Sequence, residues 1–379
     1  MTKRKEIAEN LLKTEALEEF KKIAKPIIEK LKEIIDKFQN KKNLKVAIIT
    51  HDNADPDAIS SCVVLQRYLR EHNVESDIFT NGGSQSRETK MLINSIGIKT
   101  HRFEEFDINK HTTIILIDVA SLNQSNHHIN INKNIKPDLI IDHHSTDAPF
   151  ESSATIITLL MTVMNFELKK DLATALYIGI DTDTNNGTTE KFTDFDDLAY
   201  FKILPPMIDN KLRIKIIESG SSEKEFEMLG NAASKYCLVR QGSTLIVTGV
   251  GYVDESNRSD IAKIATLLLK FAKRVTVIGI VEIKIKDKEG NITSREFSIV
   301  PSIRSRTITE NAGELSKKVF GEKAAGGDPV KASGEIKLGP TMVRLIEQAK
   351  QNKDEEALKK YFLEILKLYA DKIVEEQTK

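Results

Sequence analysis

Three short, nearly continuous apolar runs in the first half of the chain constrain its fold most strongly. They span residues 44–50, 112–120 and 137–144, and a further short run lies at 76–80. Strands of this composition are buried on both faces, which is typical of parallel sheets covered by other elements. Because helical stretches separate and follow these runs, we predict an open, mainly parallel α/β sheet. The helical stretches lie near 58–72, 86–96, 153–165 and 170–180.

The length of the chain and two adjacent prolines divide the sequence into parts. A chain of 379 residues exceeds one ordinary hydrophobic core, so two domains are expected. Pro205 and Pro206 interrupt the first pattern, and a second, smaller α/β pattern begins near residue 225. We predict a helical N-terminal extension (1–42), the parallel α/β domain (43–205), a connecting helical segment (206–240), a smaller α/β domain (241–340) and a helical C-terminal tail (341–379).

The first 40 residues are amphipathic and strongly charged. Apolar residues recur at helical spacing over 5–40, which predicts a helix or helical pair bent near Pro26. This segment either packs on the neighbouring domain or serves as an arm for a homo-oligomer or a protein partner. It has no apolar core like that of a signal peptide, and no apolar run approaches the roughly 20 residues that cross a bilayer. With only two cysteines, Cys62 and Cys237, the sequence favours a cytoplasmic protein without a membrane anchor.

Acidic residues and histidines gather at one predicted structural position, the carboxyl ends of the strands. Because the carboxyl ends of parallel strands meet at the same edge of a sheet, we expect these side chains to converge on one cleft. The clusters are His51, Asp55 and Asp57 after the first strand, Asp118 after the third, Asp142, His143 and His144 after the fourth, and Asp181 and Asp183 after a further apolar segment.

Converging carboxylates repel one another unless a positive charge lies among them. Asp and His without Cys form the ligand chemistry of a hard or borderline divalent ion such as Mn²⁺ or Mg²⁺. The number of candidates exceeds the need of one ion. It suits two ions bridged by a shared carboxylate, an arrangement that serves phosphodiester hydrolysis.

Each cluster also has a structural interpretation when it is taken alone. Asp118 after a strand could be a helix N-cap, and the Asp-Pro-Asp sequence at 55–57 is ordinary turn composition. The pair His127-His128 is expected to be a loop pair, and Asp52 and Asp181 have no assigned place. The conjunction of four clusters is what favours the metal site.

The order of these residues resembles a known family, the DHH phosphoesterases, which include RecJ-like exonucleases, oligoribonucleases and family II inorganic pyrophosphatases. The naming motif corresponds to 142–144, and the first motif, His-x-x-x-Asp-x-Asp, corresponds to 51–57. The second motif corresponds to Asp118, and the fourth to the sequence Gly-Ile-Asp-Thr-Asp-Thr with Asp183 at its ligand position. The resemblance covers about 44–340.

The resemblance implies a role for each motif residue. His144 would lie near the scissile phosphate, and Asp142 would orient a neighbouring histidine through its second ring nitrogen. Two divalent cations, with Mn²⁺ favoured over Mg²⁺, would acidify the attacking water and neutralise charge on the phosphate oxygens. The implied ligands are His51 and Asp55 for one ion, Asp57, His143 and Asp183 for the other, and Asp118 as the bridge.

In the second half, the sequence resembles the DHH-associated domain. Residues 300–306 resemble its substrate-binding strand, and 325–334 resemble its Gly-Gly-Gly-His-x-x-Ala-Ser-Gly loop. Asp328 replaces the third glycine of that loop and Pro329 replaces the histidine, so a contact to substrate phosphate is expected to be missing. The implied substrate-binding residues are Arg304, Arg306, Gly326, Gly327, Ser333 and Gly334.

The accessory segments favour one function within this family. A pyrophosphatase would lack the arginine strand paired with the glycine-containing loop, and cyclic-dinucleotide hydrolases usually carry membrane or sensory segments. The added terminal helices resemble archaeal RecJ-like proteins of replication and repair. The sequence therefore favours a metal-dependent exonuclease that hydrolyses single-stranded DNA or RNA to mononucleotides, with domain closure about a hinge near 205–225.

Two other functions stay open at this point. One is an oligoribonuclease or nucleotide-phosphate phosphatase acting on short oligonucleotides. The other is a catalytically silent replication scaffold, which is disfavoured because every ligand position holds Asp or His. A formal net charge of zero argues against a general polyanion-binding surface, and the terminal helices leave room for a replication or repair partner.

Overall fold

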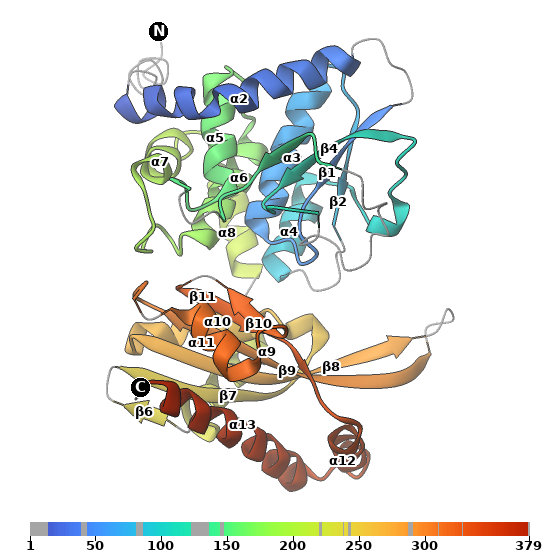
Figure 1. Ribbon diagram of the computed structural model, residues 1–379, viewed down its shortest axis with the longest axis vertical. Helices are drawn as coiled ribbons and strands as arrows, with labels where there is room; N and C mark the ends of the chain where they lie inside the picture. Colours follow the sequence, from blue (N-terminus) through green and yellow to red (C-terminus); the bar gives the residue numbers. More distant parts are fainter. Residues whose placement is uncertain are drawn as a thin grey trace. The chain divides into compact units, whose positions relative to one another are not determined.

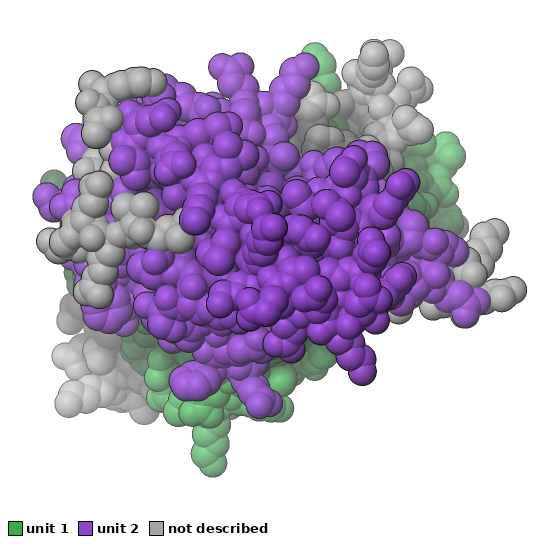
Figure 2. Space-filling view, turned by 90° about the horizontal axis from the view of Figure 1, so that it is seen from below, with its two compact units in different colours: residues 1–220 green, residues 221–379 purple. Residues whose placement is uncertain are grey.

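The computed structural model describes most of the chain in two compact units, residues 1–220 and 221–379 (Figures 1 and 2). His127-His128 and Asp328 lie outside the described residues. Within the described ranges, no helix combines the length and apolar character that a membrane crossing requires. These ranges are 14–38, 44–80, 86–122, 136–144, 148–219, 222–237, 239–241, 244–286, 291–309, 311–327 and 329–377.

The first unit is built on five parallel strands in the order β3-β2-β1-β4-β5. The chain moves outward from β1 to β3 on one side, and then places β4 and β5 on the other side. The strand order therefore reverses between β1 and β4, which is where ligands bind in open α/β sheets. The strands are β1 (Lys45–Ile49), β2 (Ser76–Phe79), β3 (Thr100–His101), β4 (His111–Ile117) and β5 (Leu139–Ile141).

Alternate residues of the central strands enter two apolar clusters, one on each face of the sheet. Val46 and Ile48 join the main core with the helices, whereas Ala47 and Ile49 join a smaller cluster with Phe103 of the short helix η1 (Phe103–Glu105). Burial on both faces confirms the parallel-sheet prediction. The remaining helices of this unit are α3 (Pro56–Glu71), α4 (Arg87–Ile96), α5 (Ser153–Val163), α6 (Lys170–Asp183), α7 (Asp194–Asp197), η2 (Leu198–Ile203) and α8 (Asn210–Ser219).

The N-terminal helix α2 (Glu15–Phe38) packs on the first unit (Figure 1). Pro26 lies inside this helix without ending it. Phe20 is 1% exposed and packs edge-on against Phe150, 5.7 Å between ring centroids, and against Phe195 at 6.3 Å. The apolar face of α2 thus belongs to the core of this unit. This agrees with the interpretation of the sequence in which the N-terminal segment packs on the neighbouring domain.

The second unit is a mixed sheet in the order β10-β11-β9-β8-β7-β6, with β12 paired to β9. Strand β7 is parallel to β8, and the other pairs are antiparallel. Helices α9 and α10 supply one apolar cluster, and α11, α12 and α13 supply another. The elements are α9 (Glu223–Gly230), η3 (Asn231–Lys235), β6 (Val239–Gln241), β7 (Leu245–Asp254), η4 (Glu255–Asn257), α10 (Asp260–Leu268), η5 (Leu269–Phe271), β8 (Arg274–Lys286), β9 (Ile292–Ser305), α11 (Ala312–Phe320), β10 (Ala325–Gly327), β11 (Lys331–Gly334), β12 (Ile336–Lys337), α12 (Pro340–Gln351) and α13 (Glu355–Gln377).

Two placements differ from the sequence-based expectation. Asp183 is the last residue of α6 and does not follow a strand, because the helix predicted to end near 180 continues for one more turn. The C-terminal tail is two helices, and Phe362 and Leu366 of α13 are fully buried in the core of the second unit. This packing makes α13 part of the unit's hydrophobic core.

Candidate metal centre

The turn from β1 into α3 positions the first three candidate ligands. Asp55 is the N-cap of α3, and its Oδ1 accepts a hydrogen bond from the Ala58 backbone N–H at 3.0 Å. Pro56 at the first helical position favours a helix start there. His51 and Asp57 lie on either side of this cap, so the local start of one helix places all three side chains at the end of β1.

Asp57 is fully buried and lies against the N-terminus of α5. Its Oδ2 accepts a hydrogen bond from the Ser153 N–H at 2.9 Å, and its Oδ1 accepts one from the Ala154 N–H at 2.8 Å. The N-terminal N–H groups of a helix have no partners within the helix and carry partial positive charge. The carboxylate of Asp57 is thereby held in a fixed orientation by backbone groups.

Asp118 follows β4 and occupies the centre of the site. Its backbone is left-handed, with φ of 58°, and its N–H donates to the Ile141 carbonyl at 2.9 Å. Such a conformation is uncommon for a residue other than glycine and persists where the surroundings determine it. Its Oδ2 lies 3.3 Å from His51 Nε2, and its Oδ1 lies 3.2 Å from His143 Nε2. The two oxygens of one carboxylate therefore face different histidines.

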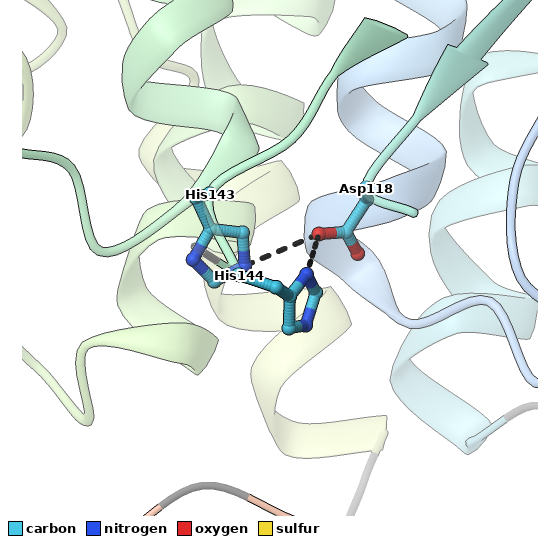
Figure 3. Close-up of side chains that lie close together, drawn as sticks. All are labelled: Asp118, His143 and His144. Atoms are coloured by element: carbon cyan, nitrogen blue, oxygen red, sulfur yellow. Dashed lines mark ion pairs between the residues drawn. The ribbon is translucent and has the colours of Figure 1, made fainter. Parts of the chain in front are cut away.

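His143 and His144, which follow β5, lie against Asp118 (Figure 3). His143 Nε2 lies 3.2 Å from both Asp118 Oδ1 and Asp183 Oδ2, and His144 Nδ1 lies 3.7 Å from Asp118 Oδ1. His144 Nδ1 also lies 2.7 Å from Asp142 Oδ1. Asp142 thus orients His144, whose side chain is 55% exposed at the rim of the site.

Close packing of α6 against α3 brings Asp183 to the same place. A Cβ on Gly179 would lie 2.5 Å from Ser60 Oγ and 3.1 Å from the Asp57 Cα, so only glycine permits this approach. Asp183 lies four residues further along α6 and therefore projects from the same side of the helix. The glycine of the motif explains how a helical residue reaches a site made by strand ends.

The predicted ligand atoms form two groups that adjoin at Asp118. Within each group, the candidate atoms lie within 4.8 Å of one another. A third group joins Asp118, His143 and His144. The two main groups are His51, Asp55 and Asp118, and Asp57, His143 and Asp183.

Electrostatics at the site reflect an excess of carboxylates over imidazoles. Burial, followed by the charges of Asp183 and Asp118, raises the pKa of Asp55 to about 6. Burial and the same two carboxylates raise the pKa of Asp57 well above its usual value. Ionising all of these groups in this small volume is therefore unfavourable without a cation.

The pKa values of the two histidines are raised as well, which favours their charged form. Burial would lower the pKa of His51, but the facing carboxylates of Asp118 and Asp55 outweigh it and raise this pKa to about 9. For His143, Asp118 and Asp183 outweigh burial in the same way and raise the pKa to about 12. Asp118, which burial alone would make less acidic, has a lowered pKa because both imidazoles face it.

The donor set fits a divalent cation. His143 Nε2 is buried and lies 3.2 Å from an oxygen of Asp118 and 3.2 Å from an oxygen of Asp183. An imidazole nitrogen that converges with two carboxylate oxygens in this way belongs to a donor set that can hold a divalent cation. Oxygen and imidazole donors without sulfur match Mn²⁺ or Mg²⁺. The ligand roles themselves stay a prediction.

Two residues near the site were not assigned a role from the sequence. Ser153 at the start of α5 donates its hydroxyl to Asp118 Oδ1 at 3.2 Å, and only its place after the Ser152 N-cap could have indicated it. Asp181, which had no assigned place, accepts a hydrogen bond from the Tyr200 hydroxyl. Asp181 therefore interacts with Tyr200 of η2, whereas Asp183 faces His143.

The arginines and serine predicted to bind substrate lie in the second unit and have internal partners. Arg304 Nη1 donates to the Ile303 carbonyl at 2.9 Å, and its Nε donates to Thr266 Oγ1 at 3.3 Å. Arg306 donates to the carbonyls of Leu269 and Lys270, both at 3.0 Å, at the end of a short helix. Ser333 donates its hydroxyl to the Pro301 carbonyl at 2.9 Å.

The predicted glycines lie in the β10–β11 pair. Gly326 pairs with Ser333, and Gly334 pairs with Ala325. Gly327 has φ of 147°, and a Cβ there would lie 2.3 Å from the Lys331 carbonyl oxygen. This hairpin therefore requires glycine for its own backbone, and substrate binding by these residues stays a prediction.

The fold and the candidate site can be compared with those of known proteins. The fold and side chains define a class of α/β protein with a candidate two-cation site at the carboxyl edge of a parallel sheet. Residues 45–180 match the DHH family, N-terminal domain. This match confirms the resemblance to the DHH family that the motifs indicate.

Relatives are similar over much of the chain. An uncharacterized protein of Methanocaldococcus jannaschii is 30% identical over 349 residues, which cover 88% of this chain and 66% of that protein. A second protein of the same organism is 28% identical over 173 residues, covering 41% of this chain and 50% of its own length. The chain thus spans about two thirds of the first relative and half of the second.

A solved structure shares the fold of both units. The crystal structure of an exopolyphosphatase-related protein from Bacteroides fragilis matches with a TM-score of 0.60 and 19% sequence identity. The match covers 88% of this chain and 97% of that chain. At this identity the likeness concerns the fold, which agrees with the predicted α/β architecture.

Proposed function

We propose that this protein is a two-metal-dependent phosphodiesterase, and specifically an exonuclease that releases mononucleotides from single-stranded DNA or RNA. The observation that carries the proposal is the convergence of six Asp and His side chains in two groups that adjoin at Asp118. The match of residues 45–180 to the DHH family, whose members are phosphoesterases, supports the reaction class. Mn²⁺ is the proposed ion, with Mg²⁺ as a possible substitute.

Different residues of the chain would have different roles in hydrolysis. His51, Asp55 and Asp118 would hold one ion, and the group around His143 would hold the other. When bound, a pair of divalent ions acidifies water and neutralises charge on the phosphate oxygens. His144 lies at the exposed rim with its ring bonded to Asp142, and it would donate a hydrogen bond or a proton to the phosphate.

The second unit would hold a flanking phosphate or the sugar-phosphate chain. Arg304 is the proposed contact, because a guanidinium provides several donors for a phosphate even while its Nε and Nη1 have internal partners. Arg306 is the second candidate, and its Nε and one terminal nitrogen bind helix carbonyls. The missing loop histidine, replaced by Pro329, removes one of the usual phosphate contacts.

The test is degradation of end-labelled single-stranded DNA and RNA, blocked at either end, with Mn²⁺ present. We expect mononucleotides from chains of many nucleotides, and none in chelator. Degradation limited to chains of a few nucleotides would favour the oligoribonuclease function. Equal rates for wild type and Asp118→Ala on every phosphodiester would contradict the enzyme proposal and favour a silent scaffold.

The first control distinguishes the two carboxylates at the end of α6. Asp183 faces His143 at 3.2 Å, whereas Asp181 pairs with Tyr200. Asp183→Asn is expected to abolish degradation, and Asp181→Asn is expected to retain it. Because the residues are two apart on one helix, this pair separates loss of a ligand from damage to the helix.

A further inference from the structure

A serine at the start of α5 contacts two of the candidate ligands at once. The Ser153 N–H donates to Asp57 Oδ2 at 2.9 Å, and its hydroxyl donates to Asp118 Oδ1 at 3.2 Å. Ser153 itself is fully buried. One residue therefore links the carboxylate proposed as the bridge to a carboxylate of the second group.

The hydroxyl fixes the direction in which the Asp118 carboxylate faces. The Ser153 bond is made to Oδ1, the oxygen on the His143 side, which leaves Oδ2 directed at His51. A terminal carboxylate rotates easily about its last bond, so a hydrogen bond to one oxygen selects a single orientation. In this orientation each oxygen faces one of the two ligand groups.

The backbone around Ser153 is held independently of this hydroxyl. Ser152 is the N-cap of α5, and its Oγ accepts the Thr155 N–H at 3.0 Å. On the far side, the Glu151 N–H donates to the Asp196 carboxylate, which also accepts the Thr155 hydroxyl at 2.6 Å. These bonds hold the helix start without the Ser153 hydroxyl, which donates to Asp118.

We propose that Ser153 is a positioning residue that sets the bridging orientation of Asp118 and so permits two cations to bind together. The proposal rests on the two-metal function proposed above. Removing a group that orients a metal ligand typically weakens metal binding about 10–100-fold. The loss should concern the second ion most, because an unrestrained Asp118 carboxylate can still serve one ion.

In the experiment, the full chain is titrated with Mn²⁺ in the absence of substrate, and binding is measured by calorimetry and by EPR. Wild type is expected to bind two Mn²⁺ per chain, with the exchange-coupled spectrum of a bridged pair. Ser153→Ala is expected to bind the second ion about 10-fold or more weakly and to lose the coupled spectrum. Ser153→Thr, which keeps the hydroxyl, is expected to restore both.

Ser152→Ala is the matched control. It removes a neighbouring serine from the same helix start, so it should lower the melting temperature while leaving Mn²⁺ affinity within about 2-fold, because caps act on helix stability. If Ser153→Ala does not fold, the same titration is made with Ser153→Cys. Because a thiol is a weak hydrogen-bond donor, this variant should also bind the second ion more weakly.

The outcomes separate this inference from the proposed function. Wild type that binds no Mn²⁺ would contradict the two-metal function itself. Wild type that binds two ions, with Ser153→Ala or Ser153→Cys binding them equally well, would overturn the positioning role alone. An equal loss in Ser153→Ala and Ser152→Ala would also overturn it, because the effect would then belong to the helix start.

Discussion

The candidate metal centre in the first unit and the predicted substrate residues in the second unit differ in what the fold explains. In the second unit, each predicted residue has an internal reason to be present: Gly327 serves a hairpin and Arg306 binds helix carbonyls. In the first unit, the carboxylates of Asp55 and Asp57 are buried beside others and their pKa values are raised. Residues that oppose folding without a ligand are stronger indicators of function than residues that support it.

The largest effect should come from the residue at which the two ligand groups adjoin. Asp118→Ala is expected to lower the rate of phosphodiester hydrolysis by more than about 100-fold, above the range for residues that only orient a ligand. Activity is measured with Mn²⁺ at saturating concentration. A fall of less than about 10-fold would show that the site does not carry the reaction.

The rim histidine should give the next largest effect and a signature in pH. His144→Ala is expected to lower kcat by about 100-fold or more if it donates a proton. The hydrogen bond that His144 donates to the Asp142 carboxylate raises the pKa of His144, so Asp142→Asn should lower this pKa. Because the protonated ring would be the active form, the alkaline limb of the kcat profile should move to lower pH. An unmoved limb would contradict this role.

Removal of a ligand carboxylate should stabilise the protein when no metal is bound. Asp55 has a folded pKa of about 6, above its ordinary 3.8, so its ionisation penalises the folded state above pH 6 and not below about pH 4. Asp55→Asn keeps an N-cap oxygen for Ala58 and should be more stable in chelator at pH 8, by roughly 1–3 kcal/mol.

The comparison with added Mn²⁺ completes this prediction. Mn²⁺ should stabilise wild type strongly and Asp55→Asn weakly, because binding to the folded state alone raises stability. The measurement is urea unfolding at pH 5 and pH 8, with and without the ion. A variant that is less stable than wild type in chelator at pH 8 would contradict the account of buried repulsion.

The smallest effect is expected in the second unit. Arg304→Ala should raise KM for a single-stranded substrate by about 10-fold with little change in kcat, as expected for loss of one charge-assisted contact. Arg306→Ala should change KM less and lower the melting temperature, since its bonds to Leu269 and Lys270 carbonyls hold a helix end. A larger rise in KM for Arg306→Ala than for Arg304→Ala would show that Arg306, and not Arg304, makes the main contact with the substrate.

The first sheet could be predicted from the sequence because apolar runs and helical stretches directly reflect burial. The run at 44–50 was predicted to be a strand, and β1 is Lys45–Ile49. The short strands β3, β10 and β12 were not predicted, because two or three residues carry no periodicity. The helical position of Asp183 was missed because the polar sequence after Ile180 resembles a loop.

The roles of Ser153 and Asp181 depend on contacts that no local pattern records. Ser153 meets Asp118 from 35 positions away, and Asp181 meets Tyr200 across 19. Spacing could place both acids of α6 near the site, yet only the orientation of the helix shows which of them faces His143. The sequence therefore predicted which Asp and His side chains converge, but it could not show how they are arranged around one another.

The most direct test of the central claim is a crystal structure with Mn²⁺, in which anomalous scattering locates the ions. The account predicts two peaks about 3.5–4 Å apart, one beside His51 and one beside His143, with the Asp118 carboxylate between them. A single peak elsewhere, or no peak among these residues at saturating Mn²⁺, would contradict it.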